Sequence, residues 1–180
     1  LGQLHQPQAP LLGIYHAAGV LQDHLLEQMT PAHVSTVMQP KAGGAWALHQ
    51  GALAIGAPLE QFVMFSPIAS LVGNSRQANY CAANGFLEGL THLRRAHGLP
   101  ALSINFGAIA GVGMLESDER IGQHLTQIGL TPLDVHVALR GLGRALAKGL
   151  AQVAVSEQAD WGKWAVYESV GGASPTFDMM

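Results

Sequence analysis

Three residues of this sequence could together transfer a proton to a carbonyl oxygen: Lys41, Tyr80 and Asn84. Tyr80 and Asn84 are four positions apart, so a helix would place them on one face, one turn from each other. A phenol has a pKa of roughly 10 and is a poor acid–base group near neutral pH unless a neighbouring cation favours its ionised form. Lys41 can supply that charge, and the Asn84 amide can orient a water. The trio indicates carbonyl reduction; the alternative is a half-exposed helix with a surface tyrosine and a capping asparagine.

The elements that must position these residues alternate between strand and helix. Short apolar runs predict strands, and capped, periodic stretches predict helices. Thr30-Pro31 and Thr131-Pro132 each indicate a helix start, because Thr is a good N-cap and Pro suits the first helical turn. The expected strands are 11–16, 62–66, 101–106 and 152–156, and the expected helices are 30–39, 41–54 with a break near Pro40, 77–97 and 131–148, with a loop at 67–76.

This alternation predicts an α/β, Rossmann-like parallel sheet flanked by helices. Ligands of such sheets bind at the carboxyl ends of the strands. His16, Ser66 and Phe106 fall at such ends. The pattern therefore places the neighbourhood of the trio in the crevice where a ligand is expected.

Composition narrows the class of protein. The chain has 180 residues, 48% hydrophobic and only 12% charged, which fits one domain that lies against others. A net charge of −3 without a basic stripe argues against nucleic-acid binding. Cys81 is the only cysteine, so no disulfide framework is expected. The nine histidines do not have the spacing of metal ligands, and the sequence has no Gly-x-Ser-x-Gly motif of a serine hydrolase. No stretch resembles a signal peptide or a membrane span, so we expect a cytoplasmic protein.

The order of motifs resembles the ketoreductase domain of modular polyketide synthases, within the short-chain dehydrogenase/reductase superfamily. The motifs are Tyr15-His-Ala-Ala-Gly, Lys41 in a helix, Phe62-Val-Met-Phe-Ser before a loop, and Tyr80 with Asn84. Ordinary members of the superfamily carry Lys four residues after the Tyr, whereas the synthase domains carry it far upstream with Asn after the Tyr. The resemblance covers residues 11–177 and disfavours the alternative of a general small-molecule dehydrogenase.

The resemblance implies reduction of a β-ketoacyl thioester by NADPH. Tyr80 would be the proton donor, Lys41 would tune it, and Asn84 would hold a water. The implied partners are an acyl carrier protein with its phosphopantetheine arm and other synthase domains, with no nucleic acid or membrane. The implied cofactor-binding residues are Ala18, Gly19, Lys41, Tyr80, Phe106 and Gly107.

The resemblance also implies that residues 1–180 are a single partial domain, the C-terminal half of a ketoreductase. No Gly-x-Gly-x-x-Gly turn follows a strand, so the N-terminal half and its phosphate loop, which would hold most of the NADPH, are expected elsewhere. Activity of this piece alone is therefore doubtful. A lid is expected at 107–130 and a packing tail at 157–180, with Trp161 and Trp164.

One position departs from the family pattern. The family has a serine thirteen residues before the Tyr that donates a hydrogen bond to the substrate carbonyl, and Pro67 stands there. Proline has no hydroxyl and no N–H. The adjacent Ser66 is an uncertain stand-in, because neighbouring strand residues point to opposite faces. The expectation is therefore an impaired reductase, and the alternative is a non-reducing structural remnant within the multienzyme.

Two residues indicate the stereochemical class. Leu21-Gln22-Asp23 resembles the Leu-Asp-Asp signature of ketoreductases that give the D-configured hydroxyl, and Asn79 matches a second marker of that class. Ser75 replaces a proline that often accompanies them. By the same resemblance His16 belongs to the turn that lines the cofactor, and it is taken as a structural residue.

Overall fold

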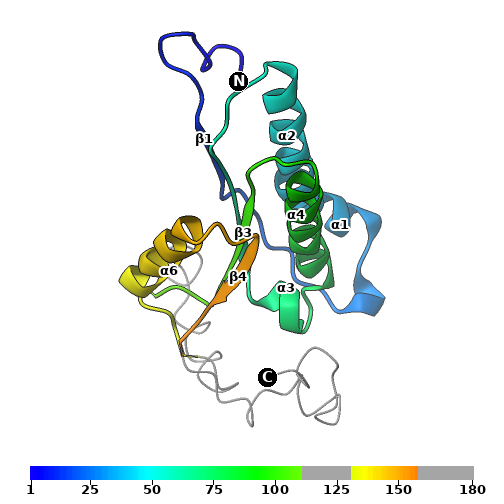
Figure 1. Ribbon diagram of the computed structural model, residues 1–180. Coiled ribbons are helices and arrows are strands. Elements are labelled where there is room, and N and C mark those ends of the chain that lie inside the picture. The colour runs from blue at the N-terminus through cyan, green and yellow to red at the C-terminus, as the bar shows by residue number, and fades with distance from the viewer. Residues whose placement is uncertain (111–130, 158–180) are drawn as a thin grey trace.

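The computed structural model describes residues 1–110 and 131–157. Its centre is a four-stranded parallel sheet with strands in sequence order, which confirms the predicted Rossmann-like class (Figure 1). Each strand ends at the same edge of the sheet, so chain segments far apart in sequence meet there. The strands are β1 (Gly13–His16), β2 (Gln61–Pro67), β3 (Leu102–Phe106) and β4 (Gln152–Val155).

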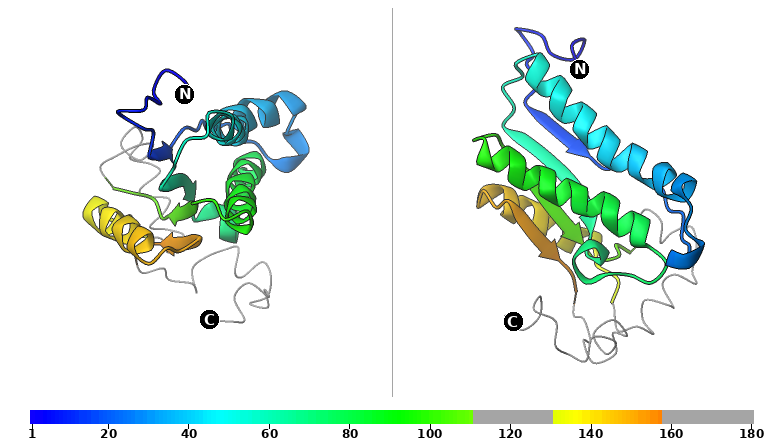
Figure 2. Two further views of the ribbon diagram at one scale, coloured as in Figure 1. Left: turned by 45° about the horizontal axis from the view of Figure 1, so that its top comes forward. Right: turned by 90° about the vertical axis from the view of Figure 1, so that its right-hand side faces the viewer.

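Helices cover both faces of this sheet (Figure 2). Helix α6 (Val135–Ala147) lies on one face, and a short helix, α3 (Ala69–Val72), follows β2 within the expected loop. The other face carries α1 (Pro31–Met38), α2 (Gly44–Ala54) and α4 (Ala78–Ala96). No described helix is long and apolar enough to cross a membrane.

Side-chain alternation along β2 builds two cores. Phe62 and Met64 are fully buried with Leu87 of α4 on one face, and Val63 is fully buried with Ala145 of α6 on the other. A strand buried on both sides reads as a continuous apolar run, because parallel sheets are covered on both faces. The core therefore fixes which residues at the strand end face α4.

The helix that carries Lys41 is continuous, so the predicted break near Pro40 is wrong. A π-helical turn, η2 (Gln39–Gly43), joins α1 to α2, and the Gly44 N–H bonds back to the Gln39 carbonyl. The wider turn accommodates the proline, which has no N–H to give. Such π turns often occur at functional sites, and this one contains the Lys41 side chain.

Helix α6 begins three residues later than Thr131-Pro132 would indicate. Leu133 is fully buried and its N–H bonds to the Ala108 carbonyl, so the chain is still extended there. The Asp134 carboxylate then caps α6 by accepting from the backbone N–H groups of His136 and Val137. The N-cap is therefore Asp134, and the Thr-Pro pair is not a helix start.

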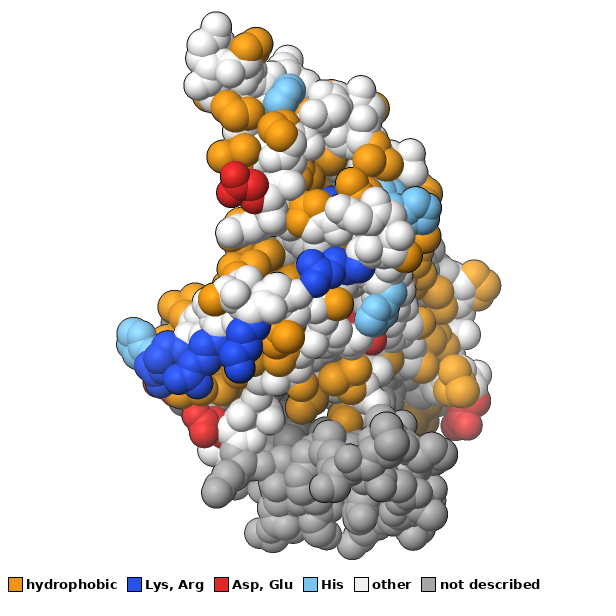
Figure 3. Space-filling view, viewed as in Figure 1, with side chains coloured by type: hydrophobic (Ala, Val, Ile, Leu, Met, Phe, Trp, Pro, Cys, Tyr) orange, Lys and Arg blue, Asp and Glu red, His pale blue; other side chains and the backbone are white. Residues whose placement is uncertain are grey.

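Charged side chains are sparse except over α6, where Lys and Arg gather (Figure 3). Arg140, Arg144 and Lys148 are exposed and follow each other at intervals of four residues along one helix face. The sequence analysis expected no basic stripe, and this short one is a difference from that expectation. Most of the expected lid, with the tail from 158 that includes Trp161 and Trp164, lies outside the described residues.

Candidate active site

The Lys41 ammonium lies over the ring of Tyr80, with Nζ 5.4 Å from the ring centroid. Nζ also donates to the carbonyl of Phe65 at 3.1 Å, near the end of β2. Lys41 is 4% exposed, and burial lowers its pKa from 10.5 to about 8. The amine is therefore still mainly protonated at neutral pH, beside a phenol that its charge can help to ionise.

Tyr80 and Asn84 face the site from successive turns of α4. Burial raises the pKa of the Tyr80 phenol, and the Asn84 side chain opposes part of that rise. The Asn84 amide donates from Nδ2 to the Tyr80 carbonyl at 2.8 Å, which fixes the orientation of the side chain. Its Oδ1 is buried and has no hydrogen-bond partner among the described residues. An orphaned acceptor of this kind is suited to a bound water.

Asn79 ties the segment after β1 to the first turn of α4. Its Nδ2 donates to the carbonyls of Gln22 at 2.9 Å and His33 at 3.3 Å. Its Oδ1 accepts from the Tyr80 N–H at 2.8 Å. Asn79 is almost fully buried, and it therefore holds Tyr80 and the 20–24 segment in one arrangement.

Asp23 is held near the same helix start. Gln77 donates from Nε2 to Asp23 Oδ2 at 2.9 Å, and Asn74 donates in turn to Gln77 Oε1 at 2.8 Å. The structure therefore brings Asp23 and Asn79 beside the turn that carries Tyr80, although more than fifty residues separate them in sequence.

The residues expected to line the cofactor lie at the carboxyl ends of the strands. Ala18 is exposed just after β1. Gly19 packs against the Lys41 side chain, so closely that an added Cβ would lie 2.8 Å from Lys41 Cε. Phe106 stacks on Phe65 with 6.0 Å between ring centroids, and the Gly107 N–H bonds to the end of β4. All four border the edge of the sheet where ligands of this fold bind.

Ser66 points to the α4 face, where its hydroxyl is already engaged. It donates to Glu88 Oε1 at 3.1 Å and shares a hydrogen bond with Ser70. Glu88 Oε1 also accepts from Ser70 and, at 2.7 Å, from Asn105. Pro67 follows on the strand and points the other way. The carboxylate network therefore holds the one hydroxyl that could have replaced the expected serine.

A family model described as the KR domain matches residues 1–111, more than half of the chain. The chain belongs to the ketoreductase domain family of polyketide synthases. This confirms the resemblance read from Lys41, Tyr80 and Asn84.

Individual relatives are large synthases. Over 140 residues the chain is 43% identical to the spectinabilin polyketide synthase system protein NorB of Streptomyces orinoci, covering 77% of this chain and 6% of that one. It is 49% identical over 100 residues to mycoketide-CoA synthase of Mycobacterium tuberculosis, covering 56% of this chain and 2% of the synthase. The chain thus spans only a small part of these relatives.

Solved ketoreductases have the same fold. An A-type ketoreductase from a modular polyketide synthase superposes with a TM-score of 0.88 at 28% identity, covering 97% of this chain and 36% of its own. The ketoreductase from the first module of phoslactomycin biosynthesis in a Streptomyces species gives 0.83 at 32%, covering 94% and 39%. An angucycline C-6 ketoreductase with bound NADP, LanV, is similar in fold alone, at 0.67 and 17% identity over 82% of this chain and 61% of its own.

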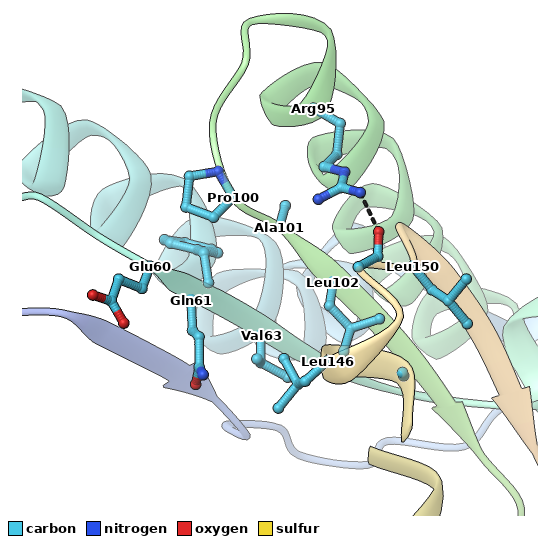
Figure 4. A pocket seen from close by; sticks show the side chains of 12 residues that line it. Glu60, Gln61, Val63, Arg95, Pro100, Ala101, Leu102, Leu146 and Leu150 are labelled. Atoms are coloured by element: carbon cyan, nitrogen blue, oxygen red, sulfur yellow. Dashed lines mark hydrogen bonds between the residues drawn. The ribbon is translucent and has the colours of Figure 1, made fainter. Parts of the chain in front are cut away.

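A pocket at the opposite edge of the ketoreductase sheet contains none of the expected site residues (Figure 4). Its floor is apolar, with Val63, Leu102 and Leu146 facing the hollow. Arg95 crosses one side and donates to the Gly149 carbonyl, which joins the end of α4 to the turn after α6. This pocket lies at the amino ends of the strands, away from Tyr80.

Sequence reasoning missed Glu88, which bonds to Ser66, and the contact by which His16 reaches Lys41. Glu88 lies one turn after Asn84 on α4, and its four-residue spacing from Asn84 was a usable signal. His16 bonds to the backbone carbonyl of Lys41, which is 25 residues away, and no sequence pattern predicts this contact.

Proposed function

We propose that this chain takes part in reducing a β-ketoacyl thioester to a β-hydroxyacyl thioester within a polyketide synthase. One observation carries the proposal: the buried Lys41 ammonium lies 5.4 Å from the Tyr80 ring centroid. A buried cation beside a buried phenol is the arrangement that proton donation to a developing alkoxide requires. Asn84, one turn later, presents the unpartnered Oδ1 that a water-assisted return of the proton needs.

The carboxyl edge of the sheet fits a dinucleotide. Small, exposed Ala17 and Ala18 follow β1 and leave that strand end open, and Phe106 and Gly107 border β3. NADPH bound along this edge would supply the hydride for the β-carbon. The residues of this chain that would hold it are Ala18, Gly19, Lys41, Tyr80, Phe106 and Gly107.

The chain's own contribution is the proton. Tyr80 gives its hydroxyl proton to the substrate oxygen as the carbonyl carbon gains a hydride, and the alkoxide becomes an alcohol. The Lys41 charge stabilises the phenolate that remains. A water held by Asn84 Oδ1 then returns a proton to Tyr80, which restores the acid.

The hydroxyl product is assigned to the D class. Gln77 binds the Asp23 carboxylate, and Asn79 binds the backbone of the same segment. Residues 20–24, which carry the Leu-Gln-Asp marker of the D class, are therefore held beside Tyr80. The substrate would arrive on the phosphopantetheine arm of an acyl carrier protein, because the relatives of this chain are multidomain synthases. The other synthase domains are then its remaining partners.

A structural, non-reducing remnant is the second candidate, and Pro67 favours it. With Ser66 bound to Glu88, no serine hydroxyl at the end of β2 is left to polarise the substrate carbonyl. Loss of one such donor typically costs about 100-fold in rate or more. Lys41, Tyr80 and Asn84 would still be in place in such a remnant.

The deciding experiment follows NADPH oxidation by the intact polypeptide that contains this chain, with a short β-ketoacyl thioester as substrate. Tyr80→Phe is the matched control, because it removes only the hydroxyl. Turnover that disappears in the control supports reduction. A well-folded protein without turnover supports the structural remnant.

A further inference from the structure

His16 contacts the catalytic lysine's backbone directly. It ends β1 and is 6% exposed, and its Nε2 lies 2.9 Å from the Lys41 carbonyl oxygen. A carbonyl oxygen can only accept, so Nε2 carries the hydrogen and donates it. Burial lowers the pKa of His16, which keeps the ring neutral in this role.

The turn that follows His16 also packs against the side chain of Lys41. Gly19, three residues later, lies against it, and an added Cβ there would come within 2.8 Å of Lys41 Cε. On the other side, the ring of His16 approaches the helix at Gly44, where an added Cβ would lie 3.1 Å from His16 Cε1. An added Cβ at Gly19 would therefore require the Lys41 side chain to shift, and one at Gly44 would require a small movement of the His16 ring.

The element that carries Lys41 needs such a restraint. Lys41 lies within the π-helical turn η2, next to Pro40, where the hydrogen-bond spacing widens from the four residues of α1 and α2 to five. The Lys41 carbonyl accepts the Gly44 N–H within the helix, and the His16 bond adds a second contact from outside it. The side chain then has a defined path past Gly19 to the Phe65 carbonyl and the Tyr80 ring.

We propose that His16 is a positioning residue for Lys41: its Nε2–H holds the π-helical turn so that the ammonium stays over Tyr80. The role rests on the proposed reduction, because it matters for catalysis only if Tyr80 is the proton donor. His16 itself does not touch the reacting atoms in this assignment. The same turn carries Ala18 and Gly19, so a ligand that moved it would also move Lys41.

The test compares His16→Phe with His16→Gln in the intact polypeptide. Phe keeps an aromatic ring but has no N–H, whereas Gln keeps a side-chain N–H donor. We expect His16→Phe to lower kcat with the β-ketoacyl thioester by about 100-fold, since a misplacement of roughly 1 Å costs that much. His16→Gln should recover at least tenfold of that loss, with less change in KM than in kcat for both variants.

A second measurement does not depend on turnover. The pH dependence of acetic anhydride labelling of Lys41, read by mass spectrometry, reports the pKa of its amine, with the exposed Lys148 as internal reference. In His16→Phe we expect the pKa of Lys41 read from the labelling profile to rise from about 8 towards 10.5, because the amine is no longer held in its buried position. If the native protein shows no turnover, the proposed function fails and this labelling still decides the role of His16.

His49→Phe is the matched control. His49 is also 6% exposed, and among the described residues its ring bonds to Arg94 at 2.9 Å and to none of the trio. We expect it to lower thermal stability without changing Lys41 labelling or the pH profile of kcat. If His16→Phe behaves like His49→Phe in both readouts, His16 is only a packed core residue and the proposal is overturned.

Discussion

The Ser66 hydroxyl donates to the Glu88 carboxylate at 3.1 Å, a contact that joins the end of β2 to the middle of α4. Glu88 lies two helical turns beyond Tyr80, so this bond directs Ser66 along α4 instead of towards the phenol. The pair therefore serves the packing of strand against helix. We therefore expect that Ser66 does not replace the hydrogen-bond donor that the family pattern has at the position of Pro67.

A Ser66→Ala variant tests this directly. We expect kcat to remain nearly unchanged, and the free energy of unfolding to fall by about 1 kcal/mol, the usual net value of one hydrogen bond. Glu88 would keep its contacts with Ser70 and Asn105. Steady-state kinetics and urea unfolding measure the two effects, and a loss of about 100-fold in kcat would instead identify Ser66 as the substrate donor.

Pro67→Ser should raise activity. The new hydroxyl stands where the family places its carbonyl donor, and one such donor is worth about 100-fold in rate. Because the gain arises in the transition state, we expect it mainly in kcat. Pro67→Ala is the control that removes the ring without adding a hydroxyl, and an equal gain in both variants would attribute the effect to the backbone.

Much of this site was predictable because its chemistry lies in local spacing. Tyr80 and Asn84 are one helical turn apart, and that interval alone predicted a shared face. Lys41 is 39 residues upstream, and it was connected to them by the cation that a reactive phenol needs and by the family pattern, not by spacing. The engagement of Ser66 by Glu88 depends on how β2 packs on α4, which no local pattern encodes.

The strands were predictable from their apolar runs, whereas two helix boundaries were mispredicted because they depend on backbone hydrogen bonds and burial. The four strands were recovered to within two residues, because each is a short apolar run and the two central ones, β2 and β3, are buried on both faces. Pro40 was taken as a break, whereas a π-helical turn absorbs it. Thr131-Pro132 has the composition of a helix start, but burial of Leu133 delays α6 to the Asp134 cap.

Stereochemical control should depend on Gln77. Its amide holds the Asp23 carboxylate at 2.9 Å beside the turn that carries Tyr80. We expect the native protein to give the D-configured β-hydroxyacyl product, and Gln77→Leu to lower the ratio of D to L product with a smaller effect on kcat. Chiral chromatography of the released acid measures this. Asn74→Leu, which removes the next contact outward, should have the weaker effect, and the reverse order would contradict the assignment.

Lys41→Met should abolish reduction while it stabilises the fold. Met has a similar length without the charge, and without that charge Tyr80 loses the cation that makes it an effective acid, a role typically worth about 100-fold or more. Burial holds the pKa of Lys41 at about 8, below the usual 10.5. Charging the amine therefore costs the folded state on the order of 3 kcal/mol near pH 7.

The direction in which stability changes with pH follows from how many protons the folded and unfolded chains bind. Between about pH 8 and 10.5 the unfolded chain binds more protons than the folded one, so the native protein gains stability as pH rises through that window. In Lys41→Met this gain should be absent, and the variant should be more stable than the native protein at pH 7. Urea unfolding at several pH values measures both, with the exposed Lys148→Met as control. The same pH dependence in the native protein and in Lys41→Met across this window would show that the Lys41 amine is hydrated instead of buried against Tyr80.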